Sequence, residues 1–123
     1  MGTILVVEDN PINMELVCEI LEAQGHTLLQ APAGSQAMKI LQDNHPDLIL
    51  MDIQLPGLDG LALTRIIKKD PKMKDITVVA LTAHAMKGDR ERILKAGCSG
   101  YIPKPIDSRE LASRVEQYLA RRS

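Results

Sequence analysis

The chain has 123 residues, a length that fits one domain spanning residues 1–123. Its 16 acidic residues and 15 lysines and arginines nearly cancel, so no overall field would attract nucleic acid or an anionic membrane, and we expect neither as a partner. No apolar run approaches the roughly 20 residues of a membrane-spanning helix, and the two cysteines lack the spacing of a disulfide framework or a metal site, so we expect a reduced, cytoplasmic protein.

Short apolar runs alternate with longer segments of helical period along the chain. The runs cover residues 3–7, 27–31, 47–51, 76–81 and 100–102. Three of them are apolar throughout, as expected for strands that helices cover on both faces. The pattern predicts an α/β fold in which helices wind around both sides of a parallel five-stranded sheet.

The predicted helices carry start and stop signals. Asn10 can cap a first helix that opens at the following proline, and Gly25 ends that helix. Gly97 closes a later helix. The last helix begins at about residue 107 or 108 and turns an apolar stripe toward the core, formed by Leu111, Val115 and Leu119.

Side chains able to do chemistry follow four of the five predicted strands. Glu8 and Asp9 follow the first, Asp52 the third, Thr82 the fourth and Lys104 the fifth. Ligands of open parallel sheets bind outside the carboxyl ends of the strands, near the point where the strand order reverses. The second strand offers no such residue, which places it at a sheet edge. The predicted strand order is therefore 2-1-3-4-5, with the five side chains sharing one pocket.

The carboxylates of this pocket would repel one another unless a cation intervened, since one lysine cannot neutralise all of them. Oxygen ligands favour a hard cation such as Mg²⁺, and half-assembled oxygen sets hold Mg²⁺ in phosphoryl-transfer sites. Lys104 and the Thr82 hydroxyl could then hold phosphoryl oxygens. One carboxylate remains free to attack phosphorus, which is an established form of covalent catalysis.

The motif residues, in chain order, are Glu8-Asp9-Asn10, Asp52, Thr82-Ala83, Tyr101 and Lys104-Pro105. In order and spacing they resemble the receiver domain of two-component response regulators, the CheY-like superfamily with a flavodoxin-like (βα)5 fold. The resemblance covers the whole chain. It is strongest to single-domain regulators of the DivK type, judged by the segments LEAQGH (21–26), MDIQLPGLDG (51–60) and residues 82–106.

The resemblance assigns roles to individual residues. Asp52 would accept a phosphoryl group from a phosphohistidine, while Thr82 and Lys104 would bind the phosphoryl oxygens. The peptide bond between Lys104 and Pro105 would be cis. A Mg²⁺ site would be formed by Glu8 acting through water, Asp9, Asp52 and the backbone carbonyl of Gln54.

The resemblance also implies a conformational switch. Phosphorylation would draw the Thr82 hydroxyl inward, and Tyr101 would rotate into space that the small Ala83 leaves reachable. This rotation would reshape the face formed by the last two helices and the last strand. By the same resemblance, Gln54 and His84 would occupy positions that tune dephosphorylation.

Together these inferences predict a stand-alone response regulator that takes phosphate from a histidine kinase or a histidine phosphotransfer protein and signals to a downstream protein. It would catalyse only its own phosphorylation and dephosphorylation, and so would not be an enzyme in the usual sense. One alternative is a phosphorelay intermediate that passes phosphate to a histidine phosphotransfer protein. An aspartate-nucleophile phosphatase is less favoured, because haloacid-dehalogenase-like enzymes carry a second aspartate where this chain has Gln54.

Other polar residues have simpler interpretations. His26 and His45 lie at predicted element boundaries and are expected to be solvated. Residues 68–74 mix lysines with an acid and a proline, which is typical of a solvated helix end and not of a nucleic-acid patch.

Overall fold

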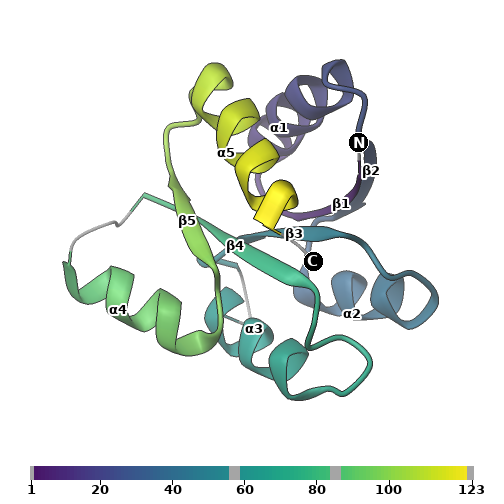
Figure 1. Ribbon diagram of the computed structural model, residues 1–123, viewed down its shortest axis with the longest axis vertical. Coiled ribbons are helices and arrows are strands. Elements are labelled where there is room, and N and C mark those ends of the chain that lie inside the picture. Colours follow the sequence, from purple (N-terminus) through teal and green to yellow (C-terminus); the bar gives the residue numbers. More distant parts are fainter. Residues whose placement is uncertain (1, 56–58, 84–86, 122–123) are drawn as a thin grey trace.

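The computed structural model describes residues 2–55, 59–83 and 87–121. Five parallel strands form one sheet in the order β2-β1-β3-β4-β5, as predicted (Figure 1). The strands are β1 (Thr3–Val7), β2 (Thr27–Ala31), β3 (Leu48–Asp52), β4 (Thr77–Thr82) and β5 (Gly100–Pro103). The helices that follow them are α1 (Pro11–Ala23), α2 (Gly34–Asp43), α3 (Gly60–Lys69), α4 (Lys87–Ala96) and α5 (Ser108–Arg121). The doubly wound α/β fold expected from the sequence is confirmed.

Helices cover both faces of the sheet, with α1 and α5 on one side and α2, α3 and α4 on the other (Figure 1). Alternate strand residues therefore enter two separate cores. Leu50 and Leu81 pack with residues of α1 and α5, whereas Ile49 and Ala80 pack with residues of the other three helices. All five residues of the central strand β3 are buried. This burial on both faces fixes the position of Asp52 at the end of the strand.

Two strands begin and end one residue later than their apolar runs predicted. The parallel ladder continues through Asp52, which pairs with Leu81, and through Thr82, which pairs with Pro103. Asp52 and Thr82 are therefore the last residues of β3 and β4 and do not belong to the loops that follow. Sheet hydrogen bonding holds both backbones in place.

The predicted helix signals act as expected. Oδ1 of Asn10 accepts hydrogen bonds from two backbone N–H groups of the first turn of α1, at 2.9 and 3.1 Å. Gly25 and Gly97 have φ angles of 90° and 110°, the left-handed conformation that ends α1 and α4. In the part of the chain that the structure describes, no helix is long and apolar enough to cross a membrane.

The expectation that His26 is solvated is wrong. Its side chain is only 1% exposed, and Nε2 lies 2.9 Å from Oε1 of Glu116 on α5. Nδ1 accepts a hydrogen bond from the backbone N–H of Gly2 at 3.1 Å. The two partners are 24 and 90 residues away along the chain, so the position of His26 at an element boundary gave no sign of them. His45, in contrast, has a side chain that is 56% exposed, as expected.

Candidate functional site

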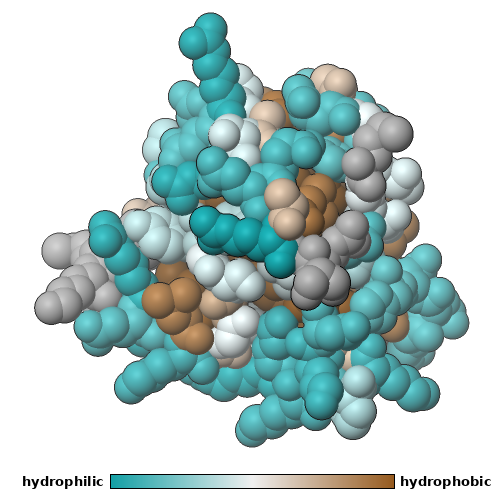
Figure 2. All heavy atoms as spheres, in the orientation of Figure 1, coloured by the Kyte–Doolittle hydropathy of each residue, from teal (hydrophilic) through white to brown (hydrophobic). Residues whose placement is uncertain are grey.

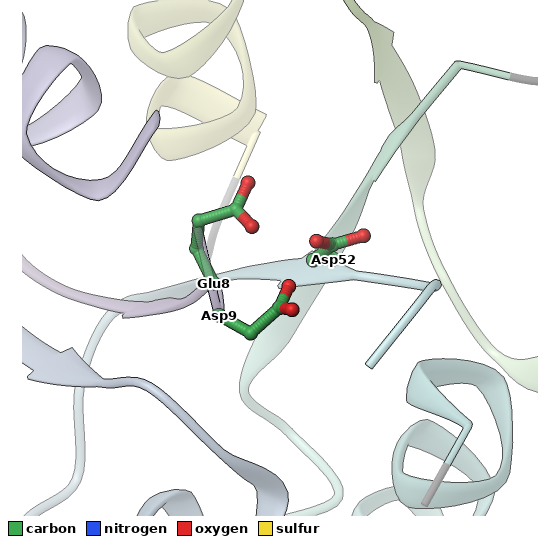
Figure 3. Close-up of side chains that lie close together, drawn as sticks. All are labelled: Glu8, Asp9 and Asp52. Carbon is green, nitrogen blue, oxygen red and sulfur yellow. The ribbon is translucent and has the colours of Figure 1, made fainter. Parts of the chain in front are cut away.

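Three carboxylates meet at the carboxyl ends of the two central strands. Glu8 and Asp9 follow β1, and Asp52 ends β3. One carboxylate oxygen from each residue lies within 4.8 Å of the others, and Figure 3 shows the side chains close together at the ends of their two strands. Glu8 and Asp52 are 1% and 2% exposed, whereas Asp9 is exposed. The site is therefore a buried pair of acids with a third acid beside it that reaches solvent.

Lys104 supplies the positive charge of the site. Its Nζ lies 2.9 Å from Oε1 of Glu8 and 3.1 Å from Oδ2 of Asp52, and the lysine side chain is 17% exposed. The backbone N–H of Lys104 donates to the carbonyl of Thr82 at 2.8 Å, which anchors the residue beside the end of β4. The peptide bond from Lys104 to Pro105 is cis, as predicted. One ammonium thus bridges two buried carboxylates that come from different strands.

The oxygens of the two buried acids differ in how they are hydrogen-bonded. Asp52 accepts the backbone N–H of Gln54 on Oδ1 at 2.9 Å and the Lys104 ammonium on Oδ2. Glu8 accepts the backbone N–H of Asn10 on Oε2 at 3.2 Å. The contact of Oε1 with Lys104 lacks hydrogen-bond geometry, and this buried oxygen has no hydrogen-bond partner within the described ranges. Glu8 Oε1 therefore forms an ion pair with Lys104 and can in addition accept a hydrogen bond, for example from a water.

The two buried acids of the site have pKa values that shift in opposite directions. Burial, together with the neighbouring Asp52 carboxylate, raises the pKa of Glu8 from 4.5 to about 7. Burial also acts on Asp52, but its contacts with Glu8, the Gln54 N–H and Lys104 outweigh burial and lower the pKa of Asp52. Burial would lower the pKa of Lys104 too, but the two carboxylates raise it overall. Asp52 is therefore an ionised carboxylate at neutral pH, and Glu8 is the one of these two buried acids that takes up a proton more readily.

The donor set fits a hard divalent cation such as Mg²⁺. Every candidate ligand atom of the acidic cluster is a carboxylate oxygen. A cation beside Asp9 and Asp52 would offset the burial and the neighbouring negative charge that raise the pKa of Glu8, and one of its waters would contact Glu8 Oε1. Asp9 is the member of the cluster that reaches solvent, so a hydrated ion can approach from its side. The carbonyl of Gln54 stays a predicted ligand, while its N–H is committed to Asp52.

The switch residues predicted from the sequence lie at the end of β4 and on β5, the strand beyond it. Thr82 is buried at the end of β4, and Ala83 follows it in an exposed position. Tyr101 lies on the neighbouring strand β5, where it pairs with Ala80 and is half-buried. The remaining tuning residue, His84, lies outside the described residues, as do Pro56 and Gly57.

Gly60 has a role in the site that the sequence did not reveal. It is the first residue of α3. A Cβ atom at this position would collide with the backbone oxygen of Asp52 and lie 2.7 Å from Cα of Ile53. Helix α3 therefore packs directly on the backbone that carries Asp52, and only glycine allows this approach. From sequence, a glycine after a strand indicates a turn, and nothing in the pattern indicates which backbone it contacts.

Comparison with known proteins gives consistent similarities over nearly the whole chain. The family model of the response regulator receiver domain matches residues 4–116. The chain is 44% identical over 117 residues to the polar-differentiation response regulator DivK of Brucella ovis, and the alignment covers 95% of each protein.

Solved structures agree with this similarity. The receiver domain of a sensor histidine kinase from Pseudomonas aeruginosa PAO1, which holds a magnesium ion in its active-site cleft, has a TM-score of 0.88 and 36% sequence identity, covering 97% of this chain and 98% of that one. The chemotaxis response regulator CheY4 of Vibrio cholerae has a TM-score of 0.91 at 20% identity, covering 96% of this chain and 98% of that one, and shares the fold. The similarity spans all four strand ends that carry the site.

Proposed function

The chain belongs to the response regulator receiver family, and on that basis we propose that it is a switch whose state is set by phosphorylation of Asp52. The observation that carries the proposal is the contact of the Lys104 ammonium with both Asp52 and Glu8 at the ends of the central strands. An ionised acid beside a fixed ammonium, within an acidic cluster suited to a divalent cation, is what a phosphoryl acceptor needs.

In the proposed reaction, an oxygen of the Asp52 carboxylate attacks the phosphorus of a phosphohistidine. The phosphorus–nitrogen bond breaks, and the released imidazole takes up a proton. The lowered pKa of Asp52 keeps this carboxylate ionised and able to attack at neutral pH. The phosphate donor would be a histidine kinase or a histidine phosphotransfer protein.

Lys104 and Thr82 would bind the phosphoryl oxygens. Lys104 Nζ already lies 3.1 Å from Oδ2 of Asp52, so it needs little movement to contact a phosphoryl group formed there. Thr82 ends the adjacent strand and pairs in the ladder with Pro103, just before Lys104. The lysine would act as a point charge and the threonine as a hydroxyl donor.

Mg²⁺ would be held by Asp9 and Asp52, by the carbonyl of Gln54, and by Glu8 through water. When bound, it would neutralise negative charge on the incoming phosphoryl group. The residues themselves prepare the site, because Lys104 and the N–H of Gln54 fix the orientation of Asp52 while Asp9 stays open to solvent.

The output would be a change of the surface formed by α4, β5 and α5. Phosphorylation would draw Thr82 inward and Tyr101 after it, past the small Ala83. Gln54 and His84 would set the rate of dephosphorylation. The protein would act on its own as a stand-alone regulator that binds a downstream protein, and its chemistry would be limited to its own phosphorylation and dephosphorylation.

Labelling with acetyl phosphate and Mg²⁺, followed by mass spectrometry of the intact protein and its peptides, tests this proposal. We expect one phosphoryl group on the peptide that contains Asp52, and no labelling of Asp52→Asn. Asp43→Asn changes an exposed acid at the end of α2 and should be labelled like the wild type. Labelling that persists in Asp52→Asn would show that another residue is the acceptor.

A further inference from the structure

The ring of Tyr101 lies beside two guanidinium groups that come from different helices. Cζ of Arg90 on α4 is 5.6 Å from the ring centroid, and Cζ of Arg114 on α5 is 6.0 Å from it. Tyr101 itself is half-buried on β5, between these helices. The three elements share one face of the molecule, which is covered mostly by hydrophilic side chains with a hydrophobic patch over α4 (Figure 2).

Arg114 is held in place independently of the tyrosine ring. Its Nη1 donates to the backbone carbonyl of Tyr101 at 2.9 Å, and its Nη2 lies 2.8 Å from Oε1 of Glu110 one helical turn earlier. A planar guanidinium fixed at two of its nitrogens has little freedom to follow a moving ring. The backbone of Tyr101 and the helix α5 thus determine where this cation lies.

Both cation–π contacts require the ring in its present position. A guanidinium stabilises an aromatic ring only within about 6 Å of the centroid. The proposed switch rotates the ring away from its present position, in which both guanidiniums contact it, while Arg114 stays held by the Tyr101 carbonyl and Glu110. The two contacts therefore stabilise one position of the ring relative to the other.

We propose that Arg90 and Arg114 form a clamp, defined as the pair of guanidiniums on Tyr101, that holds the ring in the position of the unphosphorylated protein. The inference rests on the proposed switch and adds two positioning residues to it. An equilibrium between two states shifts only by the difference in their interactions, and the clamp supplies such a difference. The clamp therefore sets how far a given phosphorylation shifts the ring from one position to the other.

Fluorine NMR of protein labelled with 3-fluorotyrosine tests the clamp, because the chain has only two tyrosines. The readout is the Tyr101 resonance without and with beryllofluoride and Mg²⁺, together with the beryllofluoride concentration needed for half of the change. Loss of one surface cation–π contact changes the ratio of the two ring positions about two- to fivefold. In Arg90→Gln and Arg114→Gln we expect the unliganded resonance to move toward its position in the beryllofluoride-bound wild type. We also expect apparent affinity for beryllofluoride to rise by up to the same factor.

Arg121→Gln is the matched control, since Arg121 is also on α5 and lies 5.7 Å from the ring of the other tyrosine, Tyr118. It should shift the Tyr118 resonance and leave Tyr101 and the beryllofluoride affinity unchanged. Arg114→Lys keeps the charge but loses the fixed planar group, and should lie between wild type and Arg114→Gln.

Two outcomes would overturn the inference in distinguishable ways. If the wild-type Tyr101 resonance responds to beryllofluoride but both glutamine variants behave like the wild type, the clamp is refuted and the proposed switch stands. If the wild-type resonance does not respond at all, the proposed switch fails and the clamp fails with it.

Discussion

The buried carboxylate of Glu8 should make the metal-free protein less stable as the pH rises. The pKa of Glu8 is about 7 in the folded chain, against an ordinary value of 4.5. The folded state therefore binds the proton more tightly than the unfolded state, and the unfolding free energy falls as pH rises from 4.5 to about 7, then levels off. Each pKa unit corresponds to about 1.4 kcal/mol, so the loss over this window is about 3 kcal/mol. The lowered pKa of Asp52 acts with the opposite sign, at pH values below this window.

Glu8→Gln isolates this effect because glutamine has nearly the same size and does not titrate. The measurement is urea unfolding followed by circular dichroism, at pH values from about 5 to about 8 and with a chelator present. The wild type should lose about 3 kcal/mol relative to Glu8→Gln across this range. Glu15→Gln, which changes an exposed acid of α1, should follow the wild type. The comparison uses the slope of the unfolding free energy against pH and not its absolute value, because the amide also changes the contact with Lys104. Parallel curves for wild type and Glu8→Gln would refute the reasoning.

Three further substitutions test how the site and its scaffold are held. Lys104→Met leaves two buried carboxylates without their cation and should lower the unfolding free energy by about 3 kcal/mol, measured by urea unfolding at neutral pH; a loss below about 0.5 kcal/mol would mean that the ion pair is unimportant. Gly60→Ala pushes α3 away from the strand end beneath it and should cost about 1–3 kcal/mol and slow acetyl phosphate labelling, whereas Gly88→Ala, where a Cβ meets nothing within 4 Å, should do neither. His26→Leu removes the acceptor of a part-buried backbone N–H. It should lower the free energy of unfolding, measured by thermal unfolding, by about 1–2 kcal/mol. His45→Leu should change this free energy by less than about 0.5 kcal/mol.

Much of the architecture follows from the sequence because it depends on local patterns. Apolar runs separated by helical segments predict a parallel sheet. The second predicted strand is followed by no side chain suited to the site, and this predicts its position at the edge of the sheet. The residues of the site could be collected from the strand ends because parallel strands end at a common edge. Asp52 and Lys104 are 52 residues apart yet in contact, and topology alone brings them together.

The rest depends on contacts that leave no local pattern. His26 is buried because Gly2 and Glu116 provide its partners, and neither lies near it in sequence. Gly60 resembles any turn glycine until its distance from the Asp52 backbone is known. Of the two arginines beside Tyr101, Arg90 is exposed and Arg114 is half-exposed. In the sequence, both look like ordinary solvated charges on a helix. Side-chain geometry, not composition or periodicity, distinguishes these residues from their neighbours.

The amide NMR spectrum of the protein, recorded with Mg²⁺ before and after addition of beryllofluoride, tests the central claim most directly. The proposed switch predicts shifts at Thr82 and Tyr101 and along α4, β5 and α5 in the wild type, and none of these in Asp52→Asn. Shifts confined to the loops next to Asp52, with α4, β5 and α5 unchanged, would contradict the claim that phosphorylation of this aspartate controls that surface.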